Sequence, residues 1–282
     1  MSEDYPPLTP ELTNFMNGHH RILYVAFGSR FFTTPENNNK ILESIIKAID
    51  KNLFDGVIWA LSQTSSDEFS PTISLNDGTE IQTSKILNNE HPNIYITKFA
   101  PQFSILNHTN TKLFFSHGGA GSAHESLYTG TPMLILPFFG DQMGNAEKLR
   151  SSGVALMLNK LDLNVDDIVN KMNLLLKDES VKKNLKRLEV LTKIYSKRKY
   201  GAADLIEYLL HSSSINGGVK DEFLKEWLPA STRMGFIKGN NLDVIVVLLG
   251  ISFGFIGVIS WVILKFIAKR ISFSASSKSK TE

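Results

Sequence analysis

The sequence contains no cysteine, which excludes disulfide bonds, thiolate nucleophiles and cysteine-based zinc sites. It also has no surplus of charge, because the formal net charge is only +2 and creates no field that would attract nucleic acid. The opening stretch MSEDYPPLTPELTNF is polar and proline-rich, so we expect no signal peptide in it. The proportions of hydrophobic residues (42%) and charged residues (21%) are ordinary, so a globular domain with a buried core is expected.

Two familiar phosphate-binding patterns are missing as well. The P-loop pattern G-x-x-x-x-G-K-[ST] does not occur anywhere in the chain. The first predicted strand ends in Gly28-Ser29-Arg30-Phe31, whereas a dinucleotide site requires G-x-G-x-x-G at that place. The sequence therefore argues against a P-loop nucleotide site and against a dinucleotide site.

One long apolar run is present near the C-terminus. The 21 residues Val244–Leu264 carry no charge, and a helix of that length crosses a hydrocarbon core of roughly 30 Å. Trp261 lies near one end of the run and basic residues follow it at once, as is typical of membrane-spanning helices. We therefore predict one transmembrane helix at 244–264 and a basic tail at 265–282.

The charges on either side of this run predict its orientation. Lys and Arg residues are frequent after the run, whereas only Arg233 and Lys238 occur shortly before it. The positive-inside rule therefore places the tail in the cytosol and the preceding domain in the lumen. The last five residues, KSKTE, match a K-x-K-x-x retrieval signal, so we expect a single-pass protein of the endoplasmic reticulum. The alternative is a tail anchor with a cytosolic domain, because no signal peptide is evident.

Ahead of the run, short apolar segments alternate with segments of helical periodicity. The predicted strands cover residues 21–28, 56–61, 93–98, 112–116, 133–136 and 154–158. The predicted helices cover residues 35–51, 101–107, 121–129, 141–151, 165–177, 179–196 and 201–213. This alternation is typical of the α/β class and predicts a Rossmann-like domain at 21–213, with a parallel sheet and helices on both of its faces.

The remaining segments carry weaker patterns. We expect residues 1–20 to form a linker, residues 62–92 a long irregular excursion, and residues 214–243 a connector to the membrane helix. Within the connector, Val219–Leu228 has an amphipathic pattern. Such a helix either lies at the bilayer surface or docks on the domain, and the sequence favours neither.

The most informative stretch covers residues 99–145 and centres on a glycine-rich turn. A predicted strand leads into the sequence HGGAGS, residues 117–122, and then into a helix. Glycines at such a turn let backbone N–H groups approach a ligand, and the helix N-terminus adds partial positive charge, so the turn suits phosphate. The side chains of His117 and Ser122 can donate hydrogen bonds to the same oxygens. On its own, such a turn is also compatible with a purely structural role.

Three further polar side chains surround this turn in the predicted fold. Glu125 lies one turn into the helix, where a carboxylate can accept hydrogen bonds from the vicinal hydroxyls of a ribose. Asp141 and Gln142 follow the next strand, at the carboxyl edge of the sheet where open α/β sheets bind ligands. A carboxylate and an amide side by side suit a polyhydroxylated sugar.

The stretch as a whole resembles the signature of the UDP-glycosyltransferase family. These enzymes have the GT-B fold and include plant secondary-product glucosyltransferases and animal glucuronosyltransferases. The matching positions are Phe99-Ala100-Pro101-Gln102, Leu106-x-His108, Phe114-Phe115-Ser116-His117-Gly118-Gly119, Ser122, Glu125, Gly130-x-Pro132-Met133, Pro137 and Asp141-Gln142. The resemblance covers residues 20–210 and extends to the C-terminal anchor of the animal members, so it implies the C-terminal, nucleotide-sugar-binding half of a GT-B fold.

The resemblance implies a role for each matching position in binding a UDP-sugar. Phe99 would stack on uracil with a smaller face than the Trp usual in the family, so we expect weaker stacking. Gly121 stands where Asn is common, which removes one side-chain donor. The implied contacts are uracil with Phe99 and the backbone of Ala100, ribose with Gln102 and Glu125, the diphosphate with Ser29, His117, Gly119, Gly121 and Ser122, and the sugar hydroxyls with Asp141 and Gln142.

The same resemblance implies inverting transfer of a hexose to a hydroxyl of a lipophilic molecule, with the UDP-sugar as co-substrate and without a cofactor or a required metal. In the family, an N-terminal domain binds the acceptor and supplies the catalytic base, a His oriented by an Asp. The sequence begins about where the linker between the two domains would lie. We therefore expect the acceptor domain and the base to be absent from this chain, and we assign no catalytic residue.

Three interpretations of such a chain stay open. It is a fragment of a full enzyme, a natural half that joins a separate acceptor-binding chain, or a non-catalytic membrane protein that binds a UDP-sugar. The first is favoured by the resemblance. In the second and third, the chain alone would bind UDP without transferring a sugar.

Overall fold

Six parallel strands form the central sheet of the computed structural model, which describes residues 5–28, 33–62, 65–74, 78–215 and 234–278. The strands are β1 (Ile22–Ala26), β2 (Gly56–Ala60), β5 (Ile94–Thr97), β6 (Thr111–Ser116), β7 (Met133–Ile135) and β8 (Ala155–Met157). Their order across the sheet is β5-β2-β1-β6-β7-β8, and every neighbouring pair is parallel. The predicted α/β fold with a parallel sheet is confirmed.

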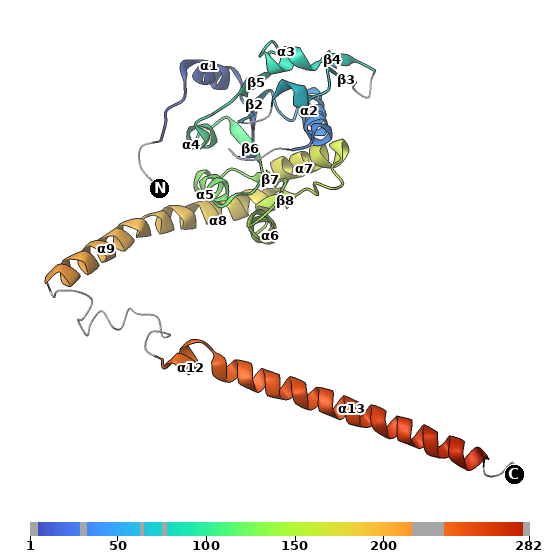
Figure 1. The fold of residues 1–282 in the computed structure, drawn as a ribbon. Helices are drawn as coiled ribbons and strands as arrows, with labels where there is room; N and C mark the ends of the chain where they lie inside the picture. The colour runs from blue at the N-terminus through green and yellow to red at the C-terminus, as the bar shows by residue number, and fades with distance from the viewer. Residues whose placement is uncertain (1–4, 29–32, 63–64, 75–77, 216–233, 279–282) are drawn as a thin grey trace. The chain divides into compact units, whose positions relative to one another are not determined.

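The central strands are apolar along their whole length because both faces of the sheet are covered. Every residue of β1 and of β2 is buried, as expected for strands of a parallel sheet between two helical layers. Helices α2 (Pro35–Asp50) and α7 (Val165–Lys177) pack against each other on one face (Figure 1). Figure 1 shows α4 (Gln102–Leu106) and α5 (Ala120–Thr129) on the other face.

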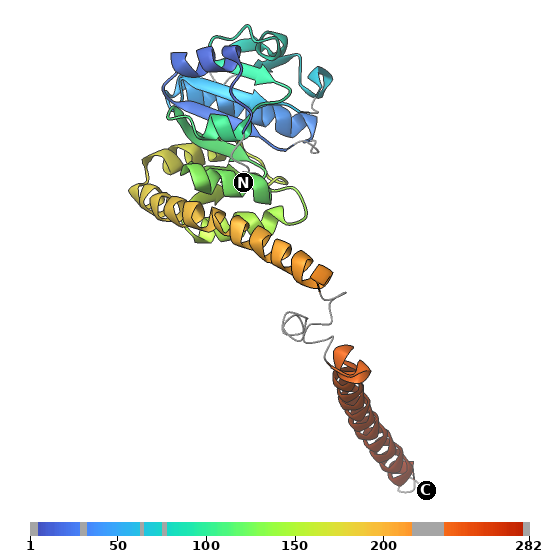
Figure 2. The same ribbon diagram turned by 90° about the vertical axis from the view of Figure 1, so that its left-hand side faces the viewer.

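Two further helices complete the domain. Helix α6 (Gln142–Ser151) packs against β8, and helix α8 (Glu179–Ser196) packs against α5. Figure 2, which views the domain from a second side, shows α8 running beside α5. Helix α5 is the next element after β6, and helix α6 is the next element after β7. The sheet therefore presents two helix starts at one of its edges.

Residues 1–20 differ from the expected linker. Helix α1 (Pro10–Gly18) begins after Thr9, whose hydroxyl oxygen accepts a hydrogen bond from the backbone N–H of Leu12. Leu12 and Met16 lie four residues apart on one helix face and are both buried in the core. The segment is thus a packed part of the domain. The sequence did not predict it because only two apolar side chains of this short, mostly polar helix are buried.

The irregular excursion expected at residues 62–92 contains more order than its composition indicated. It holds a 3-10 turn η1 (Ser66–Glu68), an antiparallel pair of strands β3 (Thr72–Ser74) and β4 (Glu80–Gln82), and helix α3 (Thr83–Leu87). Each element is five residues long or shorter, which is too short for a hydrophobic period to be read from sequence. Buried Ile73 and Ile86 attach the excursion to the core.

The chain divides into two compact units, Met1–Gly201 and Ala202–Glu282, and the second contains most of α9 (Arg198–Ile215). Its other described helices are α12 (Phe236–Gly239) and α13 (Leu242–Lys278). Within the described residues, one helical segment, Leu242–Trp261, is long and apolar enough to cross a membrane. Helix α13 continues beyond it into the segment expected as a basic tail, and Val219–Leu228 lies outside the described residues.

Candidate functional site

The sheet topology favours ligand binding at the carboxyl ends of β1 and β6. The chain builds the sheet from β1 through β2 to β5 and then returns, so that β6 lies on the other side of β1. Loops that follow β1 and β6 therefore diverge to opposite faces and leave a crevice between them. Gly28 follows β1 and His117 follows β6, so both residues lie at this switch point.

The imidazole of His117 lies between two glycines that belong to these two loops. A Cβ atom placed on Gly28 would lie 3.0 Å from His117 Nε2, and one placed on Gly119 would lie 2.5 Å from the same atom. Gly28 also has a φ of +86°, which L side chains rarely adopt. Glycine is therefore required at both positions, because only glycine lets the His117 ring pack between the β1 loop and the start of α5.

The turn between β6 and α5 leads into a helix N-terminus without a side-chain cap. Gly119 precedes the first residue of α5 without a side-chain capping bond, and Gly121 is exposed. The first N–H groups of an uncapped helix seek an acceptor, and the helix dipole adds partial positive charge at the same place. This ten-residue helix starts beside His117, at the place where the sequence predicts a phosphate site, and its start has the chemistry to hold an anion.

The local environment of His117 keeps its ring neutral near neutral pH. Burial lowers the pKa of His117, and this effect outweighs a hydrogen bond to the backbone of Ala26 and the negative charge of Asp141, which both raise it. A neutral imidazole carries one N–H group, so it can donate one hydrogen bond to an anion. A bound diphosphate would favour the protonated ring and raise its pKa.

The two residues expected to bind ribose are in contact in the structure. Gln102 is the first residue of α4, and its Nε2 donates to Glu125 Oε2 at 2.7 Å and to Ser122 Oγ at 3.1 Å. Glu125 and Ser122 lie one turn apart on α5. The amide thus orients the carboxylate and leaves its second oxygen for another donor.

A cleft of about 320 Å³ opens beside this cluster, at the carboxyl ends of β1, β2 and β5. Phe99 stands at its mouth with 76% of its surface exposed, while Ala100 is buried. An aromatic ring so exposed is free to stack on a planar ligand. The lining residues include Tyr5, Tyr24, Gly28, Phe99, Ala100, Gln102, Ser122 and Glu125.

Asp141 and Gln142 lie after β7, as expected, but only one of the two side chains is exposed to a ligand. Gln142 is buried, and its Oε1 accepts from the backbone N–H of Phe138 at 2.8 Å and of Phe139 at 3.2 Å. Its carbonyl oxygen therefore holds the turn after β7 together. Asp141 is exposed and accepts a hydrogen bond from Asn145 Nδ2 at 2.8 Å.

Two residues of the site were not identified from the sequence. The Nδ2 of Asn145 also donates to the carbonyl oxygen of Gly118 at 3.1 Å, so this amide joins the glycine turn to the loop that carries Asp141. The only signal was its position one helical turn after Asp141. Tyr5 stacks on Phe103 with ring centroids 3.6 Å apart, and its buried hydroxyl has no hydrogen-bond partner among the described residues. The polar composition around Tyr5 gave no sign of this packing.

The remaining sequence expectations concern Ser29 and metal ions. Ser29 lies outside the described residues. In the described parts of the chain, no group of three or more His, Asp or Glu side chains could hold a metal ion.

Comparisons with known proteins identify the family of the chain. Residues 2–209 match the family model described as "UDP-glucoronosyl and UDP-glucosyl transferase". The chain is 31% identical to a UDP-glycosyltransferase of Talaromyces amestolkiae over 93% of its own length and 51% of that protein. It is 35% identical to UDP-glycosyltransferase 1 of Phaeomoniella chlamydospora over 88% of its length and 50% of that protein. It therefore spans about half the length of these relatives.

A solved structure supports the fold independently. The crystal structure of a UDP-glucose: anthocyanidin 3-O-glucosyltransferase in complex with UDP superimposes with a TM-score of 0.55 at 20% identity. The match covers 68% of this chain and 40% of that protein. At this identity, the likeness concerns the fold alone.

Proposed function

Because the chain belongs to the UDP-glucoronosyl and UDP-glucosyl transferase family, we propose that its α/β domain binds the UDP-sugar donor of a UDP-glycosyltransferase. The observation that carries this proposal is the cluster of Gln102, Ser122 and Glu125, which is assembled by two hydrogen bonds at the edge of the cleft. A carboxylate held ready beside an uncapped helix start suits a ribose followed by a diphosphate.

The parts of the donor have distinct partners in this proposal. Uracil stacks on exposed Phe99 and is read by the backbone of Ala100, while ribose hydroxyls donate to Glu125. The diphosphate accepts hydrogen bonds from His117 and from the first N–H groups of α5. The hexose lies toward Asp141, with Gln142 contributing through its amide nitrogen because its carbonyl oxygen is engaged.

The proposed reaction is transfer of a hexose to a hydroxyl of a lipophilic acceptor, with inversion at the anomeric carbon. The helix start and His117 would stabilise the negative charge that develops on the departing UDP. The acceptor hydroxyl must lose a proton to a base as it attacks. In the described ranges, no hydrogen bond joins a histidine ring to a carboxylate, so we place this base outside residues 1–282.

In a second candidate function, the chain binds the UDP-sugar but does not transfer the sugar on its own. In it, the chain is a non-catalytic or split-subunit UDP-sugar-binding membrane protein that needs a separate acceptor-binding chain. The same cleft supports it.

The chain is also proposed to be a single-pass membrane protein of the endoplasmic reticulum, with a lumenal domain and a cytosolic tail. The apolar segment Leu242–Trp261 supports the membrane crossing, and the basic residues after it support the orientation. Protease treatment of sealed microsomes tests the orientation, because a lumenal domain survives digestion until detergent is added. Digestion without detergent would contradict it.

Titration of the 282-residue chain in neutral nanodiscs tests the donor site. By calorimetry, UDP is expected to bind at least about tenfold more tightly than ADP, because a purine does not fit a site built around the uracil edge. Equal affinities would overturn the proposed uracil contacts. A UDP-hexose and a lipophilic alcohol are then added, and free UDP is measured with and without an acceptor-binding domain. Release that requires this domain supports the split-subunit function.

A further inference from the structure

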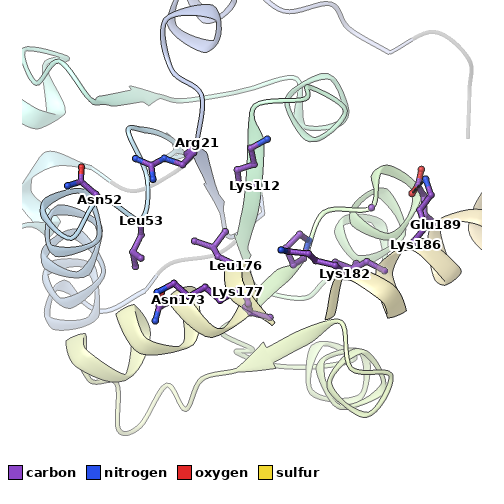
Figure 3. Close-up of a pocket in the computed structure, with 14 residues that line it drawn as sticks. Arg21, Asn52, Leu53, Lys112, Asn173, Leu176, Lys177, Lys182, Lys186 and Glu189 are labelled. Carbon is purple, nitrogen blue, oxygen red and sulfur yellow. Dashed lines mark hydrogen bonds and ion pairs between the residues drawn. The ribbon is translucent and has the colours of Figure 1, made fainter. Parts of the chain in front are cut away.

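A second cleft lies at the opposite, amino-terminal edge of the sheet, and the proposed donor site does not use it. Its volume is about 510 Å³, within the range of roughly 300–1,000 Å³ typical of small-molecule sites. Arg21 precedes β1, Lys112 is the second residue of β6, and Pro132 precedes β7, so three strand starts form one wall. The end of α7 and one face of α8 form the other wall (Figure 3).

This amino-edge cleft is strongly basic. Cationic side chains outnumber carboxylates five to one among its lining residues. Figure 3 shows Arg21 and Lys112 on the strand side, and Lys177 and Lys182 on the helix side. The cationic residues are Arg21, Lys112, Lys177, Lys182 and Lys186, and the carboxylate is Glu189.

Several of these charged side chains already form ion pairs or hydrogen bonds within the protein. Glu189 already contacts two lysines, Lys186 at 3.1 Å and Lys193 at 2.5 Å. Lys112 Nζ donates to a backbone carbonyl oxygen at 2.6 Å, and Lys182 pairs with Glu179, also at 2.6 Å.

By contrast, the structure gives the side chains of Arg21 and Lys177 no hydrogen bond or ion pair within the described ranges. The nearby carboxylate of Asp55 is engaged with backbone N–H groups, accepting from His20 at 3.0 Å and from Arg21 at 2.7 Å. Among the described residues, neither Arg21 nor Lys177 forms an ion pair, and the one partner charge is that of Asp55, whose pKa is lowered, against the effect of burial, by backbone hydrogen bonds and in part by the charge of Arg21.

Between its charged walls, the cleft is apolar. Leucine side chains line it from three elements: Leu53 after α2, Leu176 at the end of α7 and Leu185 on α8. Figure 3 shows Leu176 between the strand side and the helix side. Asn173 also lines the cleft, and its buried Oδ1 has no hydrogen-bond partner in the described part of the chain. An unpaired buried acceptor is unfavourable, so a ligand that brings a donor to Asn173 would be stabilised.

A solvated basic face without a ligand would also have many lysines. It would not combine them with an apolar interior of this volume or with an orphaned buried acceptor. Sites for small molecules are typically concave and mostly apolar, with few polar groups that converge on the ligand. The amino-edge cleft is concave and combines leucine side chains with a larger number of charged and polar ones, so it suits a ligand that has both an apolar and an anionic part.

We propose that the amino-edge cleft binds an anionic amphiphile, whose apolar body lies on the leucines and whose phosphate or carboxylate group lies between Arg21 and Lys177. Two sources share this chemistry: the headgroup and upper chain of an anionic membrane lipid, and a free amphiphilic metabolite. The site is independent of the donor cleft, since the two lie at opposite edges of the sheet.

Hexyl phosphate is a suitable probe because it combines a short apolar body with one anionic group. The 282-residue chain in phosphatidylcholine nanodiscs is titrated with hexyl phosphate, inorganic phosphate and hexanol by calorimetry, against empty nanodiscs. Hexyl phosphate is expected to bind at least about tenfold more tightly than either half-ligand, because both parts of the cleft contribute. Binding no tighter than that of inorganic phosphate overturns the proposal.

Matched variants locate the binding. Arg21→Gln with Lys177→Gln removes both unpaired charges without breaking a described ion pair, and should weaken hexyl phosphate binding about tenfold or more. Lys183→Gln, an exposed lysine on α8 outside the cleft, should leave it unchanged. Unchanged binding in the double variant overturns the proposal. The unfolding midpoint of each variant checks that it is folded.

A final experiment distinguishes a membrane lipid from a free amphiphilic metabolite as the ligand. The titration is repeated in nanodiscs that contain phosphatidic acid. Weaker apparent binding of hexyl phosphate shows competition and assigns the cleft to a bilayer lipid. Unchanged binding assigns it to a free amphiphile. Both results require that the double variant has already lost affinity in neutral nanodiscs.

Discussion

The two edges of the same sheet present opposite solutions to binding an anion. At the carboxyl edge, no Lys or Arg occurs among the described residues that line the donor cleft, and the one charged group is Glu125. At the amino edge, five cations line the second cleft. In the two proposed sites, the carboxyl edge would hold its anion with backbone N–H groups and a helix dipole, whereas the amino edge would use side-chain charges. A count of charges alone would therefore point away from the edge at which we propose that the nucleotide binds.

The largest predicted effect concerns Gly119, where no side chain fits. In Gly119→Ala, the new Cβ would meet His117 Nε2 at 2.5 Å, so the ring or the turn must move. We expect UDP affinity to fall by about 100-fold, the upper range for a strained insertion, with hexyl phosphate binding unchanged. Calorimetry with both ligands measures this.

Gly144→Ala is the matched control for that substitution. Gly144 is an exposed glycine inside α6, and a Cβ there would have open space within 4 Å. The variant should bind UDP as the unchanged chain does. If Gly119→Ala also retains UDP affinity, the ring of His117 is not held between the glycines in the way the structure shows.

A smaller effect is predicted for Glu125→Gln, which removes a charge and keeps the shape of the side chain. The unchanged chain should prefer UDP over 2′-deoxy-UDP by about tenfold, because a hydroxyl donates to the carboxylate. The variant should lose most of this preference through weaker UDP binding. Competitive titration of the two nucleotides gives the ratio, and a preference that persists in the variant would place the ribose elsewhere.

Binding at the two edges should differ in its dependence on salt concentration, which can be measured without any substitution. Raising the ionic strength from about 0.01 M to about 1 M shortens the Debye length from about 30 Å to about 3 Å. Hexyl phosphate binding depends on exposed lysine and arginine side chains, so it should weaken severalfold. UDP binding depends largely on fixed backbone dipoles, and we expect a smaller change. Equal salt dependence of both ligands would remove the distinction between the two edges.

The smallest predicted effect is the contribution of His117 to stability as pH changes. Burial lowers the pKa of His117 in the folded protein, so the unfolded state binds a proton more readily. Acidification through the unfolded pKa of about 6.5 should therefore destabilise the folded state, and the loss should level off below the folded pKa.

His117→Gln should lose this component, so its free energy of unfolding should fall less than that of the unchanged chain between pH 7.5 and pH 5, by about 1 kcal/mol or less. Denaturant unfolding at a series of pH values, followed by tryptophan fluorescence, measures the difference. Parallel pH profiles would show that His117 has the same pKa in the folded and unfolded states.

The regular part of the fold could be predicted from sequence because its pattern is strong. Fully buried strands such as β1 and β2 read as continuous apolar runs, and α2 has apolar residues at helical spacing. Helix α1 and the elements between β2 and β5 could not be predicted, because each is short and depends on a few buried side chains such as Met16 and Ile86.

The donor site shows the same division. The glycine turn, Gln102 and Glu125 could be located because they follow strand ends at recognisable spacing. The contacts of Asn145 and the closed turn of Gln142 could not, since they depend on side-chain hydrogen bonds between segments. The amino-edge cleft was invisible in the sequence, because its cations come from residues as far apart as Arg21 and Lys186.

Helix α13 is longer than the proposed membrane crossing requires, and this length has a mechanical consequence. The helix has 37 residues, of which Leu242–Trp261 suffice for a crossing. The part of α13 that follows the uncharged run Val244–Leu264 would extend as a stiff rod of about 21 Å, at 1.5 Å per residue. In the proposed membrane crossing, the end of α13 would therefore stand at a fixed reach from the bilayer surface.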